Sequence, residues 1–250
     1  MNLDRFRALA PAALKKSIAQ AIAYGPMDAG LRAIFPAGVP HYGNRIPARR
    51  RGQAASLFFG LYERAEIYMT RKLLPPGMDV VELGGSLGAN TCLIARKSRR
   101  VVCVEADPGL AADLEATLSR NGLSNVSVVP KAIASGRSAA TFSKGNTNLG
   151  GHLGSEGIEV PATSLTELLE EHGFGEYALV SDCEGAEVGI LREEPHALAR
   201  CRVALIEMGG AWDGQAYTPD QVEQMFLANG FRQTYRYGAC AAFVRESEGR

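Results

Sequence analysis

The sequence predicts an α/β fold in which a mostly parallel β-sheet alternates with helices and follows a helical N-terminal cap. From residue 78 onward, short apolar runs alternate with segments of helical periodicity, which is the pattern of a parallel α/β sheet. The last two apolar runs, 231–236 and 239–244, are separated only by Tyr237-Gly238, which predicts an antiparallel hairpin at the end of the sheet.

The N-terminal region differs in composition from the rest of the chain. Residues 11–24 place apolar side chains on one helix face, and residues 25–52 contain four prolines and are expected to be extended and looped. A second helix is expected over 53–73, because Pro75-Pro76-Gly77 ends it. We therefore expect a helical cap over 1–75 packed on a catalytic domain over 76–250. The cap is also the surface through which we expect a homodimer to form.

The second part of the chain supplies strands and helices in turn. Strands are expected at 79–83, 101–105, 126–129, 177–182 and 202–208. Helices are expected at 89–98, 107–122, 164–172, from about 186, and 218–230. Three of them carry N-terminal capping signals, which are Asp107-Pro108, Ser164-x-x-Glu167 and Thr218-Pro219-x-Gln221.

A glycine-rich turn, Gly84 to Gly88, follows the first of these strands, and Glu105 ends the next strand. The separation is 105 − 84 = 21 residues. A Rossmann-type βαβ unit holds an adenosine ribose with an acid about 20 residues beyond its glycines. The bland alternative is an ordinary tight turn, but the flanking strand, helix and acid supply the context that the motif requires. The sequence therefore predicts an adenosine-containing ligand.

The acid in front of the turn indicates which ligand this is. Glu82 is expected to be a fixed negative charge, which disfavours the pyrophosphate of a dinucleotide and favours the cationic S-adenosylmethionine. The expected cofactor-binding residues are Glu82, Gly84, Gly85, Ser86, Gly88, Asn90, Glu105, Ala106, Ala132 and Asp182.

The amino-acid composition limits which binding partners and which cellular compartment are expected for the protein. Lysine plus arginine and aspartate plus glutamate both number 27, so the net charge is zero and a field for sequence-independent nucleic-acid binding is not expected. The cluster Arg49-Arg50-Arg51 is interpreted as a solvated loop. Neither a membrane span nor a signal peptide is expected. The five cysteines form no C-x-x-C pair, which indicates reduced, mostly buried thiols of a cytoplasmic protein.

Four segments resemble the FkbM-type methyltransferases, a class I methyltransferase family. They are Val80–Asn90, Val102–Pro108, Tyr177–Leu191 with its Asp182-x-Glu184-Gly185-x-Glu187 pattern, and Val203–Glu207. The resemblance spans about 79–245 and implies a class I sheet, whose seventh strand inserts antiparallel, and S-adenosylmethionine as methyl donor. The chain departs from the family pattern at Glu82, where Asp is usual, at Ser86, where Asn is usual, and at Ser181, where Lys is often found.

Methyl transfer to a hydroxyl requires a positioned acceptor and is helped by a base. Ligands of open α/β sheets bind at the carboxyl ends of the strands, so Asp182 and Glu184 are the expected catalytic residues, and Glu207 ends the next strand. His152 is a further candidate base, because it lies in the glycine-rich segment 143–157, which has the composition of a lid over the acceptor. Asp182 as a helix N-cap and Glu184 as a partner of the helix dipole remain structural alternatives.

These carboxylates could also supply hard oxygen ligands, but no His/Cys spacing supports zinc and no metal is predicted. The leading hypothesis is an S-adenosylmethionine-dependent O-methyltransferase acting on a hydroxyl of a small molecule or sugar. One alternative is an NAD(P)-dependent oxidoreductase, since Tyr68-x-x-x-Lys72 has the short-chain dehydrogenase spacing, although it precedes the glycine-rich turn. The other is a binding or scaffold protein that kept the fold without the chemistry.

Overall fold

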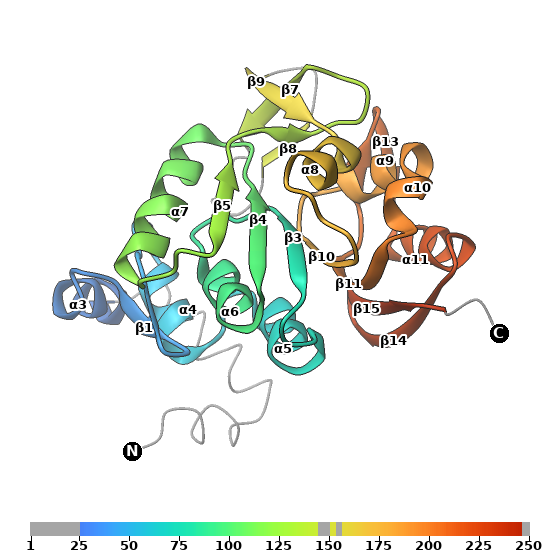
Figure 1. Cartoon of the computed structure of the whole chain (residues 1–250). Helices are drawn as coiled ribbons and strands as arrows, with labels where there is room; N and C mark the ends of the chain where they lie inside the picture. The colour runs from blue at the N-terminus through green and yellow to red at the C-terminus, as the bar shows by residue number, and fades with distance from the viewer. Residues whose placement is uncertain (1–25, 145–150, 154–156, 247–250) are drawn as a thin grey trace. The chain divides into compact units, whose positions relative to one another are not determined.

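The computed structural model of the protein describes residues 26–144, 151–153 and 157–246 (Figure 1). Two compact units divide the chain, Met1–Arg64 and Ala65–Arg250. The predicted helix over 11–24 lies outside the described residues. The division into a cap over 1–75 and a catalytic domain over 76–250 stays a prediction.

The described part of the first unit contains two helices and a small hairpin. Its elements are α3 (Pro26–Ile34), β1 (Val39–His41), β2 (Asn44–Ile46) and α4 (Gln53–Phe59). The expectation of an extended chain over 25–52 is wrong for α3, because proline in the first turn of a helix costs no hydrogen bond. The buried Asp28 carboxylate accepts the Ala55 backbone N–H at 3.0 Å and thereby ties α3 to α4.

The helix predicted over 53–73 is two helices, α4 and α5 (Arg64–Leu73). Gly60 ends α4 in the left-handed conformation, with φ 66°, and its N–H bonds to the Leu57 carbonyl oxygen. Glycine adopts this conformation without steric cost, so it is a common helix terminator. Beyond Arg64, α5 belongs to the second unit.

Seven strands of the described residues form the central sheet of the second unit, in the order β14-β15-β11-β10-β3-β4-β5. Neighbours from β11 to β5 are parallel, and β15 lies antiparallel between β11 and β14. This confirms the predicted mostly parallel sheet with its antiparallel C-terminal hairpin. The strands are β3 (Asp79–Leu83), β4 (Arg100–Val104), β5 (Val126–Val129), β10 (Tyr177–Ser181), β11 (Cys201–Glu207), β14 (Phe231–Tyr237) and β15 (Cys240–Arg245).

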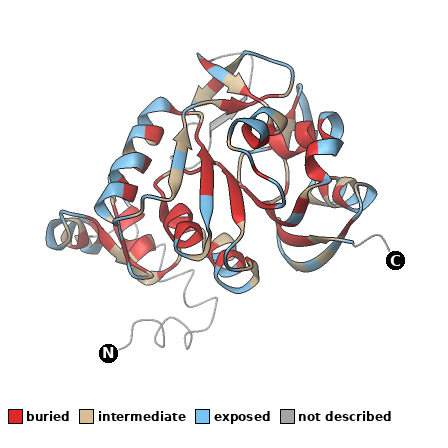
Figure 2. Ribbon diagram, in the orientation of Figure 1, coloured by how far each residue is buried: buried red, intermediate tan, exposed pale blue. Residues whose placement is uncertain are grey.

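Helices connect these strands. They are α6 (Ala89–Lys97), α7 (Pro108–Arg120), α8 (Leu165–Glu171), α9 (Ala186–Glu193), α10 (Pro195–Leu198) and α11 (Pro219–Ala228). The three for which the sequence predicts a capping signal, α7, α8 and α11, begin at that signal. Asp107 caps α7, and both predicted capping boxes, before α8 and α11, are formed. The central strands are buried along most of their length (Figure 2). One hydrophobic cluster joins alternate strand residues such as Val81 and Leu179 to Leu168 of α8, Val188 of α9 and Phe226 of α11.

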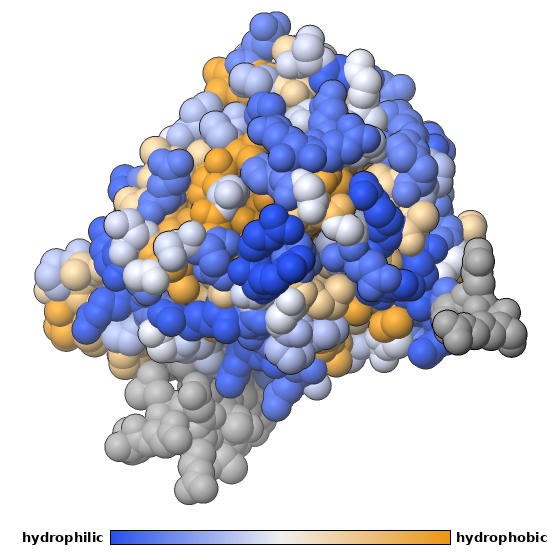
Figure 3. Space-filling view, viewed as in Figure 1, coloured by the Kyte–Doolittle hydropathy of each residue, from blue (hydrophilic) through white to orange (hydrophobic). Residues whose placement is uncertain are grey.

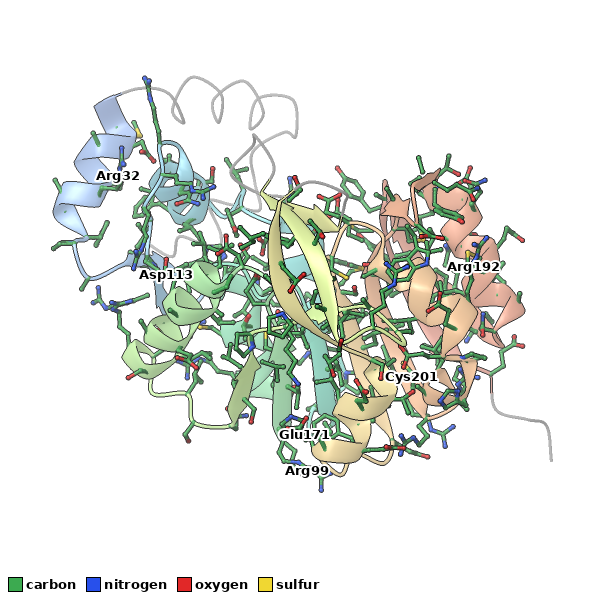
Figure 4. All side chains as sticks on the ribbon, turned by 90° about the horizontal axis from the view of Figure 1, so that it is seen from above. Arg32, Arg99, Asp113, Glu171, Arg192 and Cys201 are labelled. Carbon is green, nitrogen blue, oxygen red and sulfur yellow. The ribbon has the colours of Figure 1, made fainter. Side chains whose placement is uncertain are left out.

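Two small sheets of the second unit are absent from the sequence prediction. One has the order β6-β9-β7-β8 and is formed by β6 (Ala132–Ile133), β7 (Ala139–Lys144), β8 (Gly151–Leu153) and β9 (Ile158–Thr163). The other pairs β12 (Gly210–Trp212) with β13 (Gln215–Tyr217). The first lies on the side of the central sheet where its parallel strands end (Figures 1 and 4). The glycine-rich segment 143–157 is thus partly strand, and its residues 145–150 and 154–156 lie outside the described residues.

Hydrophilic side chains cover much of the face in Figure 3, with hydrophobic areas between them. Among the described helices, none has the length and apolar character that a membrane crossing requires. A cytoplasmic location stays a prediction. All five cysteines are free thiols, four of them buried and Cys183 half-buried, as the sequence predicts. The cluster Arg49-Arg50-Arg51 is exposed, in agreement with a solvated loop.

Candidate functional site

Four predicted residues meet at the carboxyl edge of the central sheet. The register pairs Leu83 with Val104 and with Ser181, and pairs Ser181 with Ile206. The next position on each of these four adjacent strands is therefore taken by Gly84, Glu105, Asp182 and Glu207, which we call the carboxyl-edge row. Ligands of open α/β sheets bind at such an edge.

The glycines of the turn after β3 are needed where the turn packs on its neighbours. A Cβ added to Gly84, whose φ is +88°, would lie 2.3 Å from the Asp182 carbonyl oxygen. A Cβ on Gly85 would lie 2.5 Å from the Cys103 sulfur. Gly88, with φ +82°, is the N-cap of α6. Packing of the turn against the end of β10 and against β4 thus requires glycine at positions 84 and 85.

Glu105 holds the turns after β3 and β4 together. Its Oε2 accepts the Ser86 backbone N–H at 2.9 Å, and its Oε1 accepts the Asp107 backbone N–H at 2.9 Å. Burial raises the pKa of the Glu105 carboxyl, and the two backbone hydrogen bonds oppose this rise. Each carboxylate oxygen accepts more than one hydrogen bond, so Glu105 can still receive a ribose hydroxyl. Ser86 stands where the FkbM pattern usually has Asn, and this difference in side chain leaves the backbone N–H donor in place.

Burial acts against the fixed negative charge that the sequence predicts for Glu82. Glu82 lies on β3, only 2% exposed, and burial raises its pKa to about 7 against hydrogen bonds from Cys103 and Thr91. The Oε2 of Glu82 has no hydrogen-bond partner among the described residues, and neither has the Oδ1 of the buried Asn90 on α6. Buried acceptors are normally satisfied. Two unsatisfied acceptors, one before and one after the turn, fit a ligand that brings hydrogen-bond donors or positive charge.

The loop between β10 and α9 presents Asp182 and Glu184. Asp182 is half-buried, and its backbone N–H donates to the Leu83 carbonyl oxygen at 3.0 Å. Glu184 is exposed and has a φ of +54°, which is uncommon for a residue with a side chain. Its carbonyl oxygen accepts the Ala211 N–H of β12 at 3.1 Å. The N-cap of α9 is Gly185, without a side-chain cap, so the alternative of Asp182 as an N-cap is wrong.

Glu187 is the carboxylate that organises this loop from inside. It is 1% exposed, and its Oε1 accepts the Ser181 hydroxyl at 2.6 Å and the Cys183 N–H at 3.3 Å. Its Oε2 accepts the Gly185 N–H at 3.0 Å. Burial raises its pKa, which these hydrogen bonds oppose. The acids of this loop therefore divide into an internal support, Glu187, and two groups that reach the surface at the carboxyl edge, Asp182 and Glu184.

A carboxyl pair that the sequence did not predict lies at the end of β11. Glu207 lies beside Glu66 of α5, and burial together with Glu66 raises the pKa of Glu207 to about 7. The Cys240 thiol of β15 donates to the Glu66 Oε1 at 3.1 Å. The Cys240 sulfur and one carboxyl oxygen each of Glu66 and Glu207, which are the atoms that could bind a metal, lie within 4.8 Å of one another. Burial raises the pKa of the Cys240 thiol, which favours the protonated donor over a metal-binding thiolate, and we assign no metal here.

The remaining predicted residues lie around this edge. Ala106 follows Glu105 and is half-buried, and Ala132 is buried in β6. His152 lies in β8, where its backbone pairs with that of Ser143 of β7, and β8 contacts β12. The side chain of His152 lies outside the described part. Tyr68 is 45% exposed on α5 and stacks on Tyr235 of the edge strand β14, at 5.3 Å between ring centroids. It is thus occupied in a surface aromatic contact, which removes the main support for a dehydrogenase.

The family model described as the methyltransferase FkbM domain matches residues 84–233, which is more than half of the chain. No curated protein matches the sequence. Among solved structures, magnesium protoporphyrin IX methyltransferase (ChlM) from Synechocystis PCC 6803 with bound SAM is 12% identical, with a TM-score of 0.47, over 95% of this chain and 100% of that one. The ribosomal protein L11 methylase from Lactobacillus delbrueckii subsp. bulgaricus is 11% identical, with a TM-score of 0.47, over 74% and 78%.

Proposed function

The chain belongs to the FkbM methyltransferase family, and we propose that it transfers a methyl group from S-adenosylmethionine to a hydroxyl of a small molecule or sugar. Membership of the family identifies S-adenosylmethionine as the methyl donor. The hydroxyl acceptor is the part that we propose. The donor supplies a methyl carbon already activated by a positively charged sulfur. The task of the protein is therefore to hold the acceptor oxygen in line and roughly 3–3.5 Å from that carbon.

The carboxyl-edge row supports this proposal most strongly. Three of its four positions are carboxylic acids, namely Glu105, Asp182 and Glu207, on three adjacent strand ends. Negative charge at this edge favours a sulfonium and an ammonium group and disfavours the pyrophosphate of a dinucleotide. The unsatisfied oxygens of Glu82 and Asn90 are further acceptors for the ligand. We assign the ribose hydroxyls to Glu105 and the close approach of the ligand to the Gly84–Gly88 turn.

The acceptor side of the crevice belongs to the loop after β10. Asp182 and Glu184 end that strand next to the row, with Glu184 exposed and Asp182 partly so. A carboxylate only accepts hydrogen bonds, which suits a hydroxyl that must point its proton toward the protein and its oxygen lone pair toward the methyl group. His152 stays a further candidate for contact with the acceptor. An acidic site on a chain without net charge disfavours nucleic acid and favours a small acceptor.

Isothermal titration calorimetry separates the three hypotheses. We expect S-adenosylhomocysteine to bind and NADH not to bind. A mass-spectrometric assay with S-adenosylmethionine and a panel of phenols, catechols and sugars should then show a methylated product and stoichiometric S-adenosylhomocysteine. Binding of NADH alone would support the oxidoreductase. Binding of S-adenosylhomocysteine without transfer to any hydroxyl of the panel would count against a small hydroxyl acceptor. A homodimer through residues 1–75 stays a separate proposal, which analytical ultracentrifugation tests.

A further inference from the structure

The pair of Glu66 and Glu207 lies beside the proposed acceptor position. Glu66 has no part in the proposed function as stated above, and Glu207 enters it only as one acid of the carboxyl-edge row. Glu207 occupies the position of the carboxyl-edge row next to Asp182. A carboxyl oxygen of Glu207 lies within 4.8 Å of one of Glu66, and both side chains are only partly buried. Two carboxylates this close repel each other, so the binding of one proton between them is favoured. The pair is therefore a place at the crevice where a proton can be held.

Three separate elements fix this pair. Glu207 is the last residue of β11, and the antiparallel register places Cys240 of β15 directly opposite to it. The Cys240 thiol donates to the Oε1 of Glu66, which comes from α5. One carboxyl group is thus held by a thiol and the other by its strand, so the two stay in contact. Catalytic groups held in this way need no rearrangement during the reaction.

The charges around Glu207 strengthen its hold on a proton. Burial contributes most to the rise in the pKa of Glu207. The neighbouring, negatively charged Glu66 carboxyl comes next, and the charges of Glu184 and Glu187 follow. Asp182 acts in the same sense on the neighbouring Cys240. These causes raise the pKa of Glu207 to about 7. An efficient general base has a pKa near the working pH, because it must be ionised before the step and bind the proton during it.

We propose that Glu207 is the base that takes the proton of the acceptor hydroxyl, and that Glu66 is the positioning residue that shares this proton with it. The inference rests on the proposed function. As the acceptor oxygen bonds to the methyl carbon, the sulfur–carbon bond breaks and its electron pair stays on the sulfur. The hydroxyl proton passes to the ionised Glu207 carboxylate and is then shared with Glu66. Asp182 and Glu184 hold the acceptor during this step.

The first test measures the pair without any acceptor. The full chain is labelled with ¹³C at the glutamate carboxyl groups, and its NMR signals are followed from pH 4 to pH 9. Glu82 and Glu207 should both titrate near pH 7, and the signal lost in Glu207→Gln identifies the second. In Glu66→Gln the Glu207 inflection should fall by about one pH unit or more, because a like charge and a shared proton are removed. The Glu82 inflection should not move in that variant and is the internal control.

The second test measures transfer to the panel compound that is methylated fastest. The single-turnover rate should rise with pH through an inflection near 7. Glu207→Gln should lower this rate by about 100-fold or more and flatten the profile, as expected for a lost general base. Glu66→Gln should shift the inflection to lower pH, and Glu66→Asp should restore it. Glu115→Gln, at an exposed position of α7, should change neither rate nor profile.

The outcomes separate the pair from the proposed function. If S-adenosylhomocysteine binds but Glu207 titrates near pH 4, or if the Glu207→Gln profile keeps its inflection, the inference is overturned. A shift of the Glu207 signal on addition of Zn²⁺ or Mg²⁺ would also overturn it, because the pair would then hold a metal instead of a proton. Failure of every panel compound would contradict the hydroxyl acceptor while the titration still decides whether the pair shares a proton. Retained binding of S-adenosylhomocysteine shows that each variant is folded.

Discussion

Glu105 accepts the backbone N–H of Ser86 at 2.9 Å, and this hydrogen bond joins the turns that follow β3 and β4. The second oxygen of the same carboxylate accepts the Asp107 N–H at 2.9 Å. One side chain thus sets the geometry of both turns over which the adenosine part of the donor is proposed to bind. The proposal thus gives Glu105 a ribose contact in addition to this structural one.

We predict that Glu105→Gln weakens the binding of S-adenosylhomocysteine by about 10- to 100-fold, which corresponds to roughly 1.5–3 kcal/mol for a lost hydrogen bond to a charged group. The glutamine amide keeps one acceptor oxygen but turns an N–H toward one of the two backbone donors, so the melting temperature should also fall. Calorimetry and thermal unfolding measure the two effects. Glu115→Gln on α7 is the matched control. Unchanged affinity would remove Glu105 from the donor site.

A second prediction concerns the acceptor side. Asp182 is tied into the sheet through its backbone N–H, which donates to Leu83, so a change of its side chain should leave the strand in place. We predict that Asp182→Asn lowers the methyl-transfer rate by about 10- to 100-fold, because a charged hydrogen bond to the acceptor becomes a neutral one. Affinity for S-adenosylhomocysteine should stay nearly unchanged. If Asp182→Asn no longer binds S-adenosylhomocysteine, Asp182 belongs to the methyl-donor site. If the variant is as active as the wild type, Asp182 has no catalytic role.

The strand ends of the site could be predicted from sequence, since they depend on local patterns. Gly84, Glu105 and Asp182 each follow an apolar run, and the ends of parallel strands meet at one edge. Glu66 could not be predicted in this way. Its partner Cys240 is 174 residues away, and helical periodicity does not say which residue of α5 reaches the end of β11. The sequence also gives no sign of the raised pKa of Glu82, because burial, which raises it, is not visible in a pattern of residue types.

The small sheets were missed for a different reason. The three residues of β8 are too few to show the alternation by which a strand is recognised, and their partners in β7 lie beyond a glycine-rich stretch. The helix α3 was missed because its first residue, Pro26, was interpreted as a breaker when proline also starts helices. The helix break at Gly60 carries a signal that could have been used, since glycine often ends helices in the left-handed conformation.

A third prediction concerns the opposite edge of the sheet. Asp79 is 2% exposed at the start of β3 and bonds Arg99, labelled in Figure 4, at 2.6 Å and Arg100 at 2.5 Å. Burial would raise the pKa of Asp79, but the hydrogen bonds from both arginines outweigh it and the pKa is lowered. Asp79→Asn should lower the melting temperature at pH 7 by only about 2–4 °C, because both arginines are largely solvated and solvent screens the pair.

The pH dependence checks that this effect is electrostatic. A carboxyl group whose pKa is lowered in the folded state stabilises the protein above the unfolded pKa of about 3.9, and this contribution is lost as the pH falls through the lower folded value. The melting temperatures of wild type and Asp79→Asn should therefore converge toward pH 3. A difference that persists there would mean that the side chain stabilises the fold by its shape and not by its charge.

The last prediction concerns Glu82, which burial places in the opposite situation. Its folded pKa of about 7 lies above the unfolded value, so between the two values the folded protein binds more protons than the unfolded chain. The free energy of unfolding should therefore fall as the pH rises from 5 to 7 and level off above that. Glu82→Gln stays neutral, so it should gain on the wild type by up to about 3 kcal/mol between pH 5 and pH 8. Urea unfolding at both pH values measures this gain.

Burial and Glu66 raise the pKa of Glu207 into the same range, so Glu207→Gln is measured in parallel, and Glu115→Gln controls for the loss of one exposed charge. Equal pH dependence in wild type and Glu82→Gln would show that Glu82 is ionised throughout, and the fixed negative charge under the glycine-rich turn would be restored as a partner for the sulfonium.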